Sequence, residues 1–203
     1  MKNNALIIFT RNPELGKVKT RLAKTIGDEK ALEIYKELLL HTKSETQNLD
    51  GDKFVFYDQN IIINDIWSDE IYSKKLQSGK DLGERMQNAF QELFDQGYKN
   101  CIIVGSDLFD LQAKIVDEAF EKLENGEVVI GPAEDGGYYL LGLKKVIPEI
   151  FQHKNWGTET VLDDTLKDLK NQYVEFLVSL NDIDTFEDLE KSNYYQNIKI
   201  YEK

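Results

Sequence analysis

The stretch from Cys101 to Asp110 constrains the fold of this chain more than any other. Its apolar run, 101–104, predicts a strand buried on both faces, as the central strands of parallel sheets are. The sequence Gly-Ser-Asp, ending at Asp107, follows at the carboxyl end of that strand, and a helical pattern starts at Leu111. Ligands of open α/β sheets bind just beyond the carboxyl ends of the strands. Asp107 is therefore in position to hold a divalent cation against a phosphate, although it could also simply fix the loop.

Asp110 has a simpler explanation, because it immediately precedes the apolar positions of the expected helix. Aspartate is a favoured N-cap, since its side chain accepts a hydrogen bond from the first helical turn. We therefore assign the chemical role in this stretch to Asp107 and a capping role to Asp110.

The composition indicates one globular unit. The three prolines and thirteen glycines are scattered over 203 residues, so no linker divides the chain, and we expect one domain over 1–203. The longest apolar runs have about six residues, far fewer than a membrane span needs. The single cysteine, Cys101, excludes an internal disulfide and a cysteine zinc site. The amino terminus leads straight into a strand without a signal-peptide core, so we expect a cytoplasmic protein with no membrane contact.

Charge is distributed unevenly along the chain. The 25 Lys and Arg residues face 37 Asp and Glu residues, which gives a net charge of −12. Residues 1–24 nevertheless hold six Lys or Arg and one Glu, a net charge of +5, which leaves −17 for the remainder. A net acidic surface repels nucleic acids and anionic membranes, so neither is an expected partner. The basic segment is suited instead to a small anion such as a phosphate group.

That basic segment is a loop that follows the first expected strand, 5–10. Pro13 and Gly16 break the chain there, and Val18 stands where a P-loop has Ser or Thr, so the loop is not a P-loop. It is either a phosphate site or a solvated basic segment, and charge alone does not decide between them. Its cations are Arg11, Lys17, Lys19 and Arg21.

A second motif opens a helix near Asp81. Asp81 with Glu84 three residues later is a capping-box pattern, and the apolar positions of a helix follow it. Gly83 is not explained by a cap, because glycine weakens a first helical turn. We interpret Gly83 as room for a ligand to approach the helix N-terminus, where unpaired N–H groups favour an anion.

A third motif lies between two expected strands, 127–131 and 138–143. Asp-Gly-Gly is a strong turn signal, so the link could be a plain hairpin. The link is longer than a hairpin needs and has adjacent carboxylates, and its glycines would let a ligand approach the backbone. Of the two tyrosines that follow, one is expected in the core, and the other could line a pocket. The residues concerned are Glu134, Asp135, Gly136, Gly137, Tyr138 and Tyr139.

The remaining elements follow from hydrophobic spacing. Trp156 precedes a helix that we expect Thr158 to cap, and its ring could staple that helix or stack on a sugar or base. Asp184 with Glu187 fits a capping box for the last helix. His41 and His153 have no acidic or nucleophilic partner nearby, so a serine triad or histidine zinc site is poorly supported. We expect helices over 28–47 and 181–189 and strands over 53–57, 71–76 and 173–179, and leave 61–67 open as strand or loop.

Five motifs occur together in the order in which one bacterial family has them. They are Phe9-Thr10-Arg11-x-Pro13-x-x-Gly16-x-Val18-Lys19-Thr20-Arg21-Leu22, Asp81-Leu82-Gly83-x-Arg85-Met86, Gly105-Ser106-Asp107, Gly131-Pro132-Ala133-x-Asp135-Gly136-Gly137-Tyr138-Tyr139-Leu140 and Trp156-Gly157-Thr158. On these residues the chain resembles the bacterial transferase 1 family (radical-SAM/selenodomain-associated, DUF2064) of the nucleotide-diphospho-sugar transferase superfamily. The resemblance spans nearly the whole chain. Some members are linked to arsenosugar biosynthesis as glycosyltransferases, and more distant relatives include the molybdopterin and phospholactate guanylyltransferases.

The resemblance implies an α/β fold of the Rossmann-like GT-A type, a three-layer sandwich with a mostly parallel central sheet. It also implies a nucleotide over the strand ends, with Mg²⁺ or Mn²⁺ bridging its phosphates. Asp107 matches the superfamily's metal-binding aspartate, and Asp135 is the best second carboxylate for metal binding and catalysis. Phe109 departs from the family, which usually has proline there. The nucleotide-binding or substrate-binding residues implied are Arg11, Lys17, Lys19, Arg21, Asp81, Gly83, Gly136, Gly137, Tyr138 and Trp156.

We therefore expect a metal-dependent transferase that moves a glycosyl group from a nucleoside diphosphate sugar to a small-molecule acceptor. The cation and the basic loop would share the charge of the leaving diphosphate. Asp135 and Glu134 are the candidates for a general base. Two alternatives stay open: a nucleotidyltransferase that uses a nucleoside triphosphate and releases pyrophosphate, and a non-catalytic nucleotide-binding protein, which the departure at Phe109 keeps open.

Overall fold

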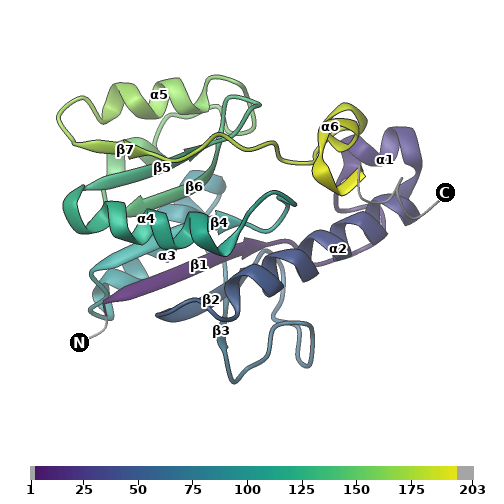
Figure 1. Ribbon diagram of the computed structural model, residues 1–203, viewed down its shortest axis with the longest axis horizontal. Coiled ribbons are helices and arrows are strands. Elements are labelled where there is room, and N and C mark those ends of the chain that lie inside the picture. Colours follow the sequence, from purple (N-terminus) through teal and green to yellow (C-terminus); the bar gives the residue numbers. More distant parts are fainter. Residues whose placement is uncertain (1–2, 196–203) are drawn as a thin grey trace.

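A seven-stranded sheet in the order β3-β2-β1-β4-β6-β5-β7 forms the centre of the structure, a computed structural model that describes residues 3–195 (Figure 1). Strand β6 runs antiparallel to β4 and β5, and the other neighbouring strands are parallel, so the predicted mostly parallel sheet is confirmed. The strands are β1 (Asn4–Thr10), β2 (Asp52–Tyr57), β3 (Tyr72–Leu76), β4 (Asn100–Gly105), β5 (Val128–Pro132), β6 (Tyr138–Leu143) and β7 (Val174–Phe176).

Helices cover both faces of the sheet, because β1 and its neighbours are apolar on both sides. Leu6 and Ile8 pack with apolar residues of α2 and α4, whereas Ala5 and Ile7 pack with those of α3, α5 and a short 3₁₀ helix. The predicted three-layer α/β sandwich is confirmed. The helices are α1 (Thr20–Ile26), α2 (Asp28–Thr46), α3 (Leu82–Asp95), α4 (Ala113–Asn125), α5 (Val161–Asp168), α6 (Phe186–Lys191) and the 3₁₀ helix η1 (Pro148–Phe151).

The order of the strands creates a crevice between β1 and β4. The chain leaves β1 for β2 and β3 and then returns to place β4 on the other side of β1, with Phe9 beside Gly105 at their carboxyl ends. Such a switch point is where open α/β sheets bind ligands. Helices α1 and α6 lie side by side beyond this end of β1, at the right of Figure 1. The N-terminal basic loop and the C-terminal segment are thereby brought to the same edge of the sheet.

The structure corrects the predicted start of α4. The helix begins at Ala113 with Gln112 as N-cap, and the Ala113 N–H donates to the Glu45 carboxylate of α2 at 2.8 Å. Asp110 does not cap it, and instead accepts a hydrogen bond from Asn193 at 2.6 Å. The prediction was wrong because the partner that satisfies this helix end lies far away in the sequence.

Two other predicted caps are also wrong. Helix α6 is capped by Thr185 with Asp188, not by Asp184 with Glu187, and both hydrogen bonds of the capping box are formed there. Helix α5 starts at Val161, and the Thr158 hydroxyl donates to the carbonyl of Asn155. A capping-box pattern shifted by one residue is nearly as good locally, so tertiary contacts decide which one forms.

The remaining differences are shorter or irregular elements. Strand β7 covers only three residues of the expected 173–179. The segment 61–67 contains no strand, and its buried Trp67 packs edge-on against Tyr72 at a ring distance of 5.0 Å. Between residues 3 and 195, no helix is both long enough and apolar enough to cross a membrane. One domain over 1–203 and a cytoplasmic location stay predictions.

Candidate functional site

A cavity of about 590 Å³ lies at the carboxyl ends of β1 and β4. It collects five of the residues that the sequence singled out, which are Arg11, Lys19, Arg21, Asp81 and Asp107. The fold therefore places the basic loop opposite the aspartate that follows the central strand. The other charged residues of the lining are Asp58, Lys80, Arg85 and Asp184.

The start of the basic loop is fixed from α2 by Tyr35. Its buried hydroxyl accepts the N–H of Arg11 at 2.9 Å, lies 3.1 Å from the Arg11 carbonyl oxygen, and lies 3.3 Å from the Thr10 hydroxyl. Burial raises the pKa of Tyr35, so the hydroxyl stays protonated. Asn12 is held by Asp58, whose carboxylate accepts the Asn12 N–H at 2.8 Å. The backbone that carries the exposed Arg11 side chain is thus fixed on both sides.

Lys19 is the most constrained cation of the site. Its side chain is only 3% exposed, and its Nζ lies 2.9 Å from Asp107 Oδ2 and 3.0 Å from Asp184 Oδ1. Burial by itself lowers the pKa of Lys19, but the two carboxylates outweigh burial and raise that pKa above its usual value. Lys19 therefore stays an ammonium, and it joins the basic loop to both Asp107 and Asp184.

Asp184 is a residue of this site that sequence reasoning placed in a cap. It lies between β7 and α6 and pairs with Arg21 as well as with Lys19. Burial opposes ionisation, but Lys19 and then Arg21 hold the pKa of Asp184 below its usual range. The segment is also tied to the central loop, since the Ile183 N–H faces the Asp107 carbonyl oxygen at 3.5 Å.

Asp182 is a second acidic residue that sequence reasoning missed. Burial, followed by the neighbouring carboxylates of Asp107, Asp135 and Asp184, raises the pKa of Asp182 to about 7. The shift means that Asp182 is partly desolvated and lies near other carboxylates. A signal was available, because Asp182 follows the last strand of a sheet in which carboxyl ends gather ligands.

The chemistry of these groups suits a hard divalent cation. Carboxylate oxygens are preferred ligands of Mg²⁺, which commonly uses one or two of them together with substrate phosphates. In this structure the Lys19 ammonium is the cation that Asp107 and Asp184 share. Among the described residues, no three His, Cys, Asp or Glu side chains are arranged to hold a metal ion by themselves.

Asp81 and its neighbours form the wall of the cavity at α3. The Asp81 carboxylate accepts the Glu84 N–H at 2.9 Å, as predicted for an N-cap. The Glu84 carboxylate accepts the N–H of Lys80 at 2.8 Å rather than that of Asp81, so the predicted box is only half formed. Arg85 is held by the Gly79 carbonyl at 3.2 Å. Two cations that the sequence analysis did not select, Lys80 and Arg85, therefore line this side of the cavity.

Lys17 is not brought into the cavity. Its side chain is 60% exposed and pairs with Glu14 at 2.6 Å, one turn of chain away. The basic loop contributes Arg11 and residues 18–21 to the lining of the cavity, from either side of Lys17. The sequence shows that the loop is basic, but the backbone conformation decides whether each charged side chain points into the cavity or away from it.

Packing explains why position 83 of α3 is a glycine, whereas the sequence suggested that a ligand needs the room. A Cβ at Gly83 would lie 2.3 Å from the Phe151 carbonyl oxygen and 2.6 Å from the Trp156 ring. The space beside Gly83 is therefore filled by protein, and Gly83 with Trp156 forms a packing contact between α3 and the segment before α5. The interpretation of Gly83 as an approach for a ligand is corrected here.

The β5–β6 link is a hairpin that docks against the start of α5. The exposed Asp135 accepts the Gly137 N–H at 2.9 Å, and Gly136 accepts the Leu162 N–H through its carbonyl at 3.0 Å. Gly136 has φ +88°, and a Cβ there would lie 2.2 Å from the Glu159 carbonyl oxygen. Backbone packing thus explains Gly136, and none of these link residues lines the cavity described above.

The two tyrosines after the hairpin point to opposite faces of β6. Tyr139 is buried, and its hydroxyl donates to the Val178 carbonyl at 3.0 Å. Tyr138 packs in the apolar cluster under α3 and α5, where burial raises its pKa. Tyr138, a predicted nucleotide contact, therefore lies outside the lining of this cavity.

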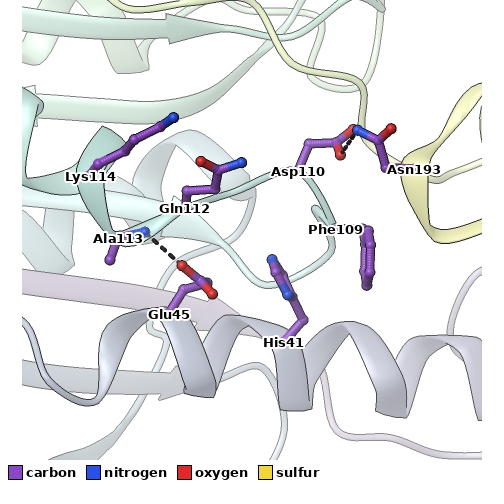
Figure 2. A pocket seen from close by; sticks show the side chains of 8 residues that line it. All are labelled: His41, Glu45, Phe109, Asp110, Gln112, Ala113, Lys114 and Asn193. Atoms are coloured by element: carbon purple, nitrogen blue, oxygen red, sulfur yellow. Dashed lines mark hydrogen bonds between the residues drawn. The ribbon is translucent and has the colours of Figure 1, made fainter. Parts of the chain in front are cut away.

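A second cavity, of about 620 Å³, lies behind the loop that carries Asp107 (Figure 2). In Figure 2 His41 of α2 and Phe109 of the loop lie on one side, with a ring distance of 4.7 Å. His41 Nε2 donates to the Leu111 carbonyl at 2.7 Å, and this hydrogen bond ties the loop between β4 and α4 to helix α2. The two cavities share no lining residue. Phe109, the position at which the sequence departs from the pattern expected of the family, thus packs against His41 and does not line the cavity that contains Asp107.

Comparison with known proteins shows the family and the fold of this chain. The family described as "Uncharacterized protein conserved in bacteria (DUF2064)" matches residues 43–158. A crystal structure from Desulfovibrio desulfuricans G20, provisionally assigned as a nucleotide-diphospho-sugar transferase, is 30% identical with a TM-score of 0.85, covering 98% of this chain and 95% of that chain. The 2-phospho-L-lactate guanylyltransferase of Methanocaldococcus jannaschii is 29% identical over 180 residues, which are 86% of this chain and 76% of that protein.

A more distant likeness concerns the fold alone. The 4-diphosphocytidyl-2C-methyl-D-erythritol synthase of Anaerococcus prevotii DSM 20548 is 12% identical with a TM-score of 0.59, covering 97% of this chain and 96% of that chain. The match of more than half of the chain to the family and the likeness to the Desulfovibrio structure lead to one conclusion. This chain belongs to the bacterial family DUF2064, and its fold is that of the nucleotide-diphospho-sugar transferases.

Proposed function

We propose that this protein is a nucleotidyltransferase that binds a nucleoside triphosphate in the cavity at the ends of β1 and β4. One observation carries the proposal: the cavity that contains Asp107 is also lined by Arg11, Lys80 and Arg85, three cations that form no ion pair within the part of the chain that the structure describes. A triphosphate has more negative charge than a diphosphate sugar, so three cations without a carboxylate partner suit it better. The relative from Methanocaldococcus jannaschii is a guanylyltransferase, which supports the same choice.

The chain's own groups have defined tasks in this reaction. A phosphate oxygen of the acceptor attacks the α-phosphorus, the bond to the β-phosphate oxygen breaks, and pyrophosphate leaves with the electron pair. Arg11, Lys80 and Arg85 bind the phosphates and neutralise the charge that develops on the leaving group. A phosphate acceptor is already ionised near neutral pH, so this reaction needs no general base.

We also propose that Mg²⁺ or Mn²⁺ binds at Asp107, with Asp182 as a further carboxylate ligand. When bound, the ion neutralises phosphate charge and orients the phosphates for attack. The raised pKa of Asp182 supports this placement, because a cation would relieve the repulsion that causes the shift. Asp135, the second carboxylate predicted from the sequence, contributes to that shift from the hairpin and stays a predicted ligand.

Glycosyl transfer from a nucleoside diphosphate sugar is the second candidate. The provisional assignment of the Desulfovibrio relative as a nucleotide-diphospho-sugar transferase favours it. The same cations and carboxylates would then hold a diphosphate leaving group. The two reactions differ in the donor that binds and in whether pyrophosphate is released.

The test is a thermal-shift screen of the four nucleoside triphosphates and of UDP-, GDP-, ADP- and CDP-sugars, each with and without Mn²⁺. A bound ligand raises the melting temperature by an amount that grows with its concentration over Kd. We expect a metal-dependent shift with a triphosphate, and pyrophosphate release when 2-phospho-L-lactate or another phosphorylated acid is added. Shifts with nucleotide sugars alone would favour glycosyl transfer, and no shift with any nucleotide would contradict both.

Replacement of Arg11 by glutamine is expected to weaken nucleotide binding by about tenfold or more, since charge-assisted hydrogen bonds to phosphate are lost. Its exposed side chain has no ion pair among the described residues, so the melting temperature of the free protein should hardly change. Lys17→Gln is the matched control, because it removes one charge from the same loop outside the cavity. Calorimetric titration of both variants checks the prediction, and equal losses would show that only the overall charge matters.

A further inference from the structure

Lys19 combines three properties, which concern its burial, its backbone conformation and its ion pairs. Its side chain is almost fully buried although it is charged, and it lies in a cavity that we assign to phosphates and a metal ion. Its backbone has φ +48° and ψ +41°, the left-handed region that residues with a side chain seldom adopt. Its ammonium is shared by two carboxylates that come from different parts of the chain, 88 and 165 residues away. Such a strained backbone at a functional site points to a role for the residue held there.

The geometry of the two ion pairs sets up a competition. Asp107 is the carboxylate that we propose for the metal ion, and the Lys19 ammonium lies 2.9 Å from its Oδ2. A divalent cation bound at Asp107 would lie within a few ångströms of the ammonium, where two positive charges repel strongly in a partly buried place. Asp184 then remains as a partner for Lys19, but Asp184 also pairs with Arg21.

We propose that Lys19 is an internal counter-cation, which occupies the carboxylates of the ligand-free site and yields to a divalent cation only when nucleotide phosphates draw its ammonium away. This inference rests on the proposed function in that the site takes a nucleotide and a metal ion. The lysine side chain suits the task, because its ammonium is a point charge on a long, flexible stem. The phosphates offer Lys19 new anionic partners at the moment when they also supply ligands to the metal ion.

The consequence is that the metal ion and the nucleotide each strengthen the binding of the other. Part of this coupling arises because the phosphates are ligands of the metal ion, and the release of Lys19 adds a further part. Coupling of this kind is reciprocal, so each ligand raises the affinity for the other by the same factor. Without nucleotide, Asp107 and its neighbours would keep their internal partner and bind free divalent cations weakly. Lys19 therefore determines how strongly the affinity for the metal ion depends on bound nucleotide.

The experiment measures Mn²⁺ binding without nucleotide, from the electron paramagnetic resonance signal of free Mn²⁺, in wild type and in Lys19→Met. Methionine has a similar length and no charge. We expect Lys19→Met to bind Mn²⁺ alone at least about tenfold more tightly than wild type, because the repelling charge is gone. Lys24→Met is the matched control: it removes one charge from an exposed position in the last turn of α1, outside the cavity, and should leave the affinity nearly unchanged.

A second titration repeats the measurement with the triphosphate that gives the largest thermal shift. Nucleotide should strengthen Mn²⁺ binding more in wild type than in Lys19→Met. If Lys19→Met does not fold, Lys19→Gln replaces it, because its amide can still donate to the carboxylates. Thermal unfolding of each variant establishes that it is folded before its Mn²⁺ affinity is compared.

The outcomes separate this inference from the proposed function. Metal-dependent nucleotide binding in wild type, with equal Mn²⁺ affinities in wild type and Lys19→Met, would overturn the counter-cation role and leave the proposed function standing. Tighter Mn²⁺ binding in Lys19→Met, in a protein that binds no nucleotide, would support the competition between Lys19 and the metal ion, but it would overturn the release of Lys19 by nucleotide and contradict the proposed function. Equal tightening in Lys24→Met would also overturn the role, because the effect would then come from overall charge.

Discussion

Replacement of Asp107 by asparagine should abolish metal-dependent nucleotide binding and lower any turnover by about a hundredfold or more, the size of effect typical for a group that stabilises charge at the reacting centre. Asparagine keeps the shape of the side chain and removes its charge. The carboxylate lies at the end of β4 and is about one third exposed, so it can reach a ligand in the cavity. The measurement is the thermal shift with nucleoside triphosphate and Mn²⁺, and chelation of the metal from wild type should give the same loss.

The free protein should tolerate this change. Lys19 loses one of its two carboxylate partners but keeps Asp184, so we expect a cost of roughly 1 to 2 kcal/mol in unfolding free energy. Asp110→Asn is the control, because it makes the same chemical change three residues later, at a position that contacts Asn193 outside the cavity. A metal-dependent shift that survives in Asp107→Asn would show that the metal ion does not bind at this carboxylate.

Replacement of Gly136 by alanine should cost about 3 kcal/mol or more of unfolding free energy, from left-handed backbone strain and from overpacking against backbone. Gly136 has φ +88°, and the new Cβ would lie 2.2 Å from the carbonyl oxygen of Glu159. The three atoms nearest to that Cβ all belong to the backbone of Glu159, so no flexible side-chain end can move aside. The change should also displace the start of α5, since Leu162 donates to the carbonyl of Gly136. Chemical denaturation of both proteins gives the difference.

Gly157→Ala separates the two causes. Gly157 has φ +80°, and nothing lies within 4 Å of the Cβ that alanine would add. It should therefore cost only the strain of the backbone, about 1 kcal/mol. Equal losses in the two variants would mean that the contact with Glu159 is not tight. If Gly136→Ala loses no more unfolding free energy than Gly157→Ala but binds nucleotide more weakly, Gly136 contacts the ligand, as the sequence suggested.

The sequence was sufficient for most of the elements and for one end of the site. The apolar strand that ends at Gly105 and the basic loop after β1 were both found from local patterns. Local patterns work there because buried strands need uninterrupted apolar residues, and because parallel strands present their carboxyl ends at one edge. Asp107 and Arg11 could therefore be expected at the same edge before their contacts were known.

Caps and glycines were predicted less well. Asp110 and Asp184 both fit a local cap, but each has a partner from a distant segment instead. Gly83 was interpreted as room for a ligand, although Phe151 and Trp156 fill that room. In each case the local pattern was present but not decisive, because contacts with distant segments determined the role of the residue.

By itself, the sequence determined the α/β layers and the edge of the sheet where the site lies, and it placed a basic loop and Asp107 there. Only the tertiary structure decided which charges meet: it paired Lys19 with Asp107 and Asp184, turned Lys17 outward, and brought Asp182 near the carboxylates of Asp107 and Asp184. The physical reason is that periodicity and propensity act over a few residues, whereas these pairings join segments up to 165 residues apart. Their geometry depends on how α6 packs beside α1, which no local pattern encodes.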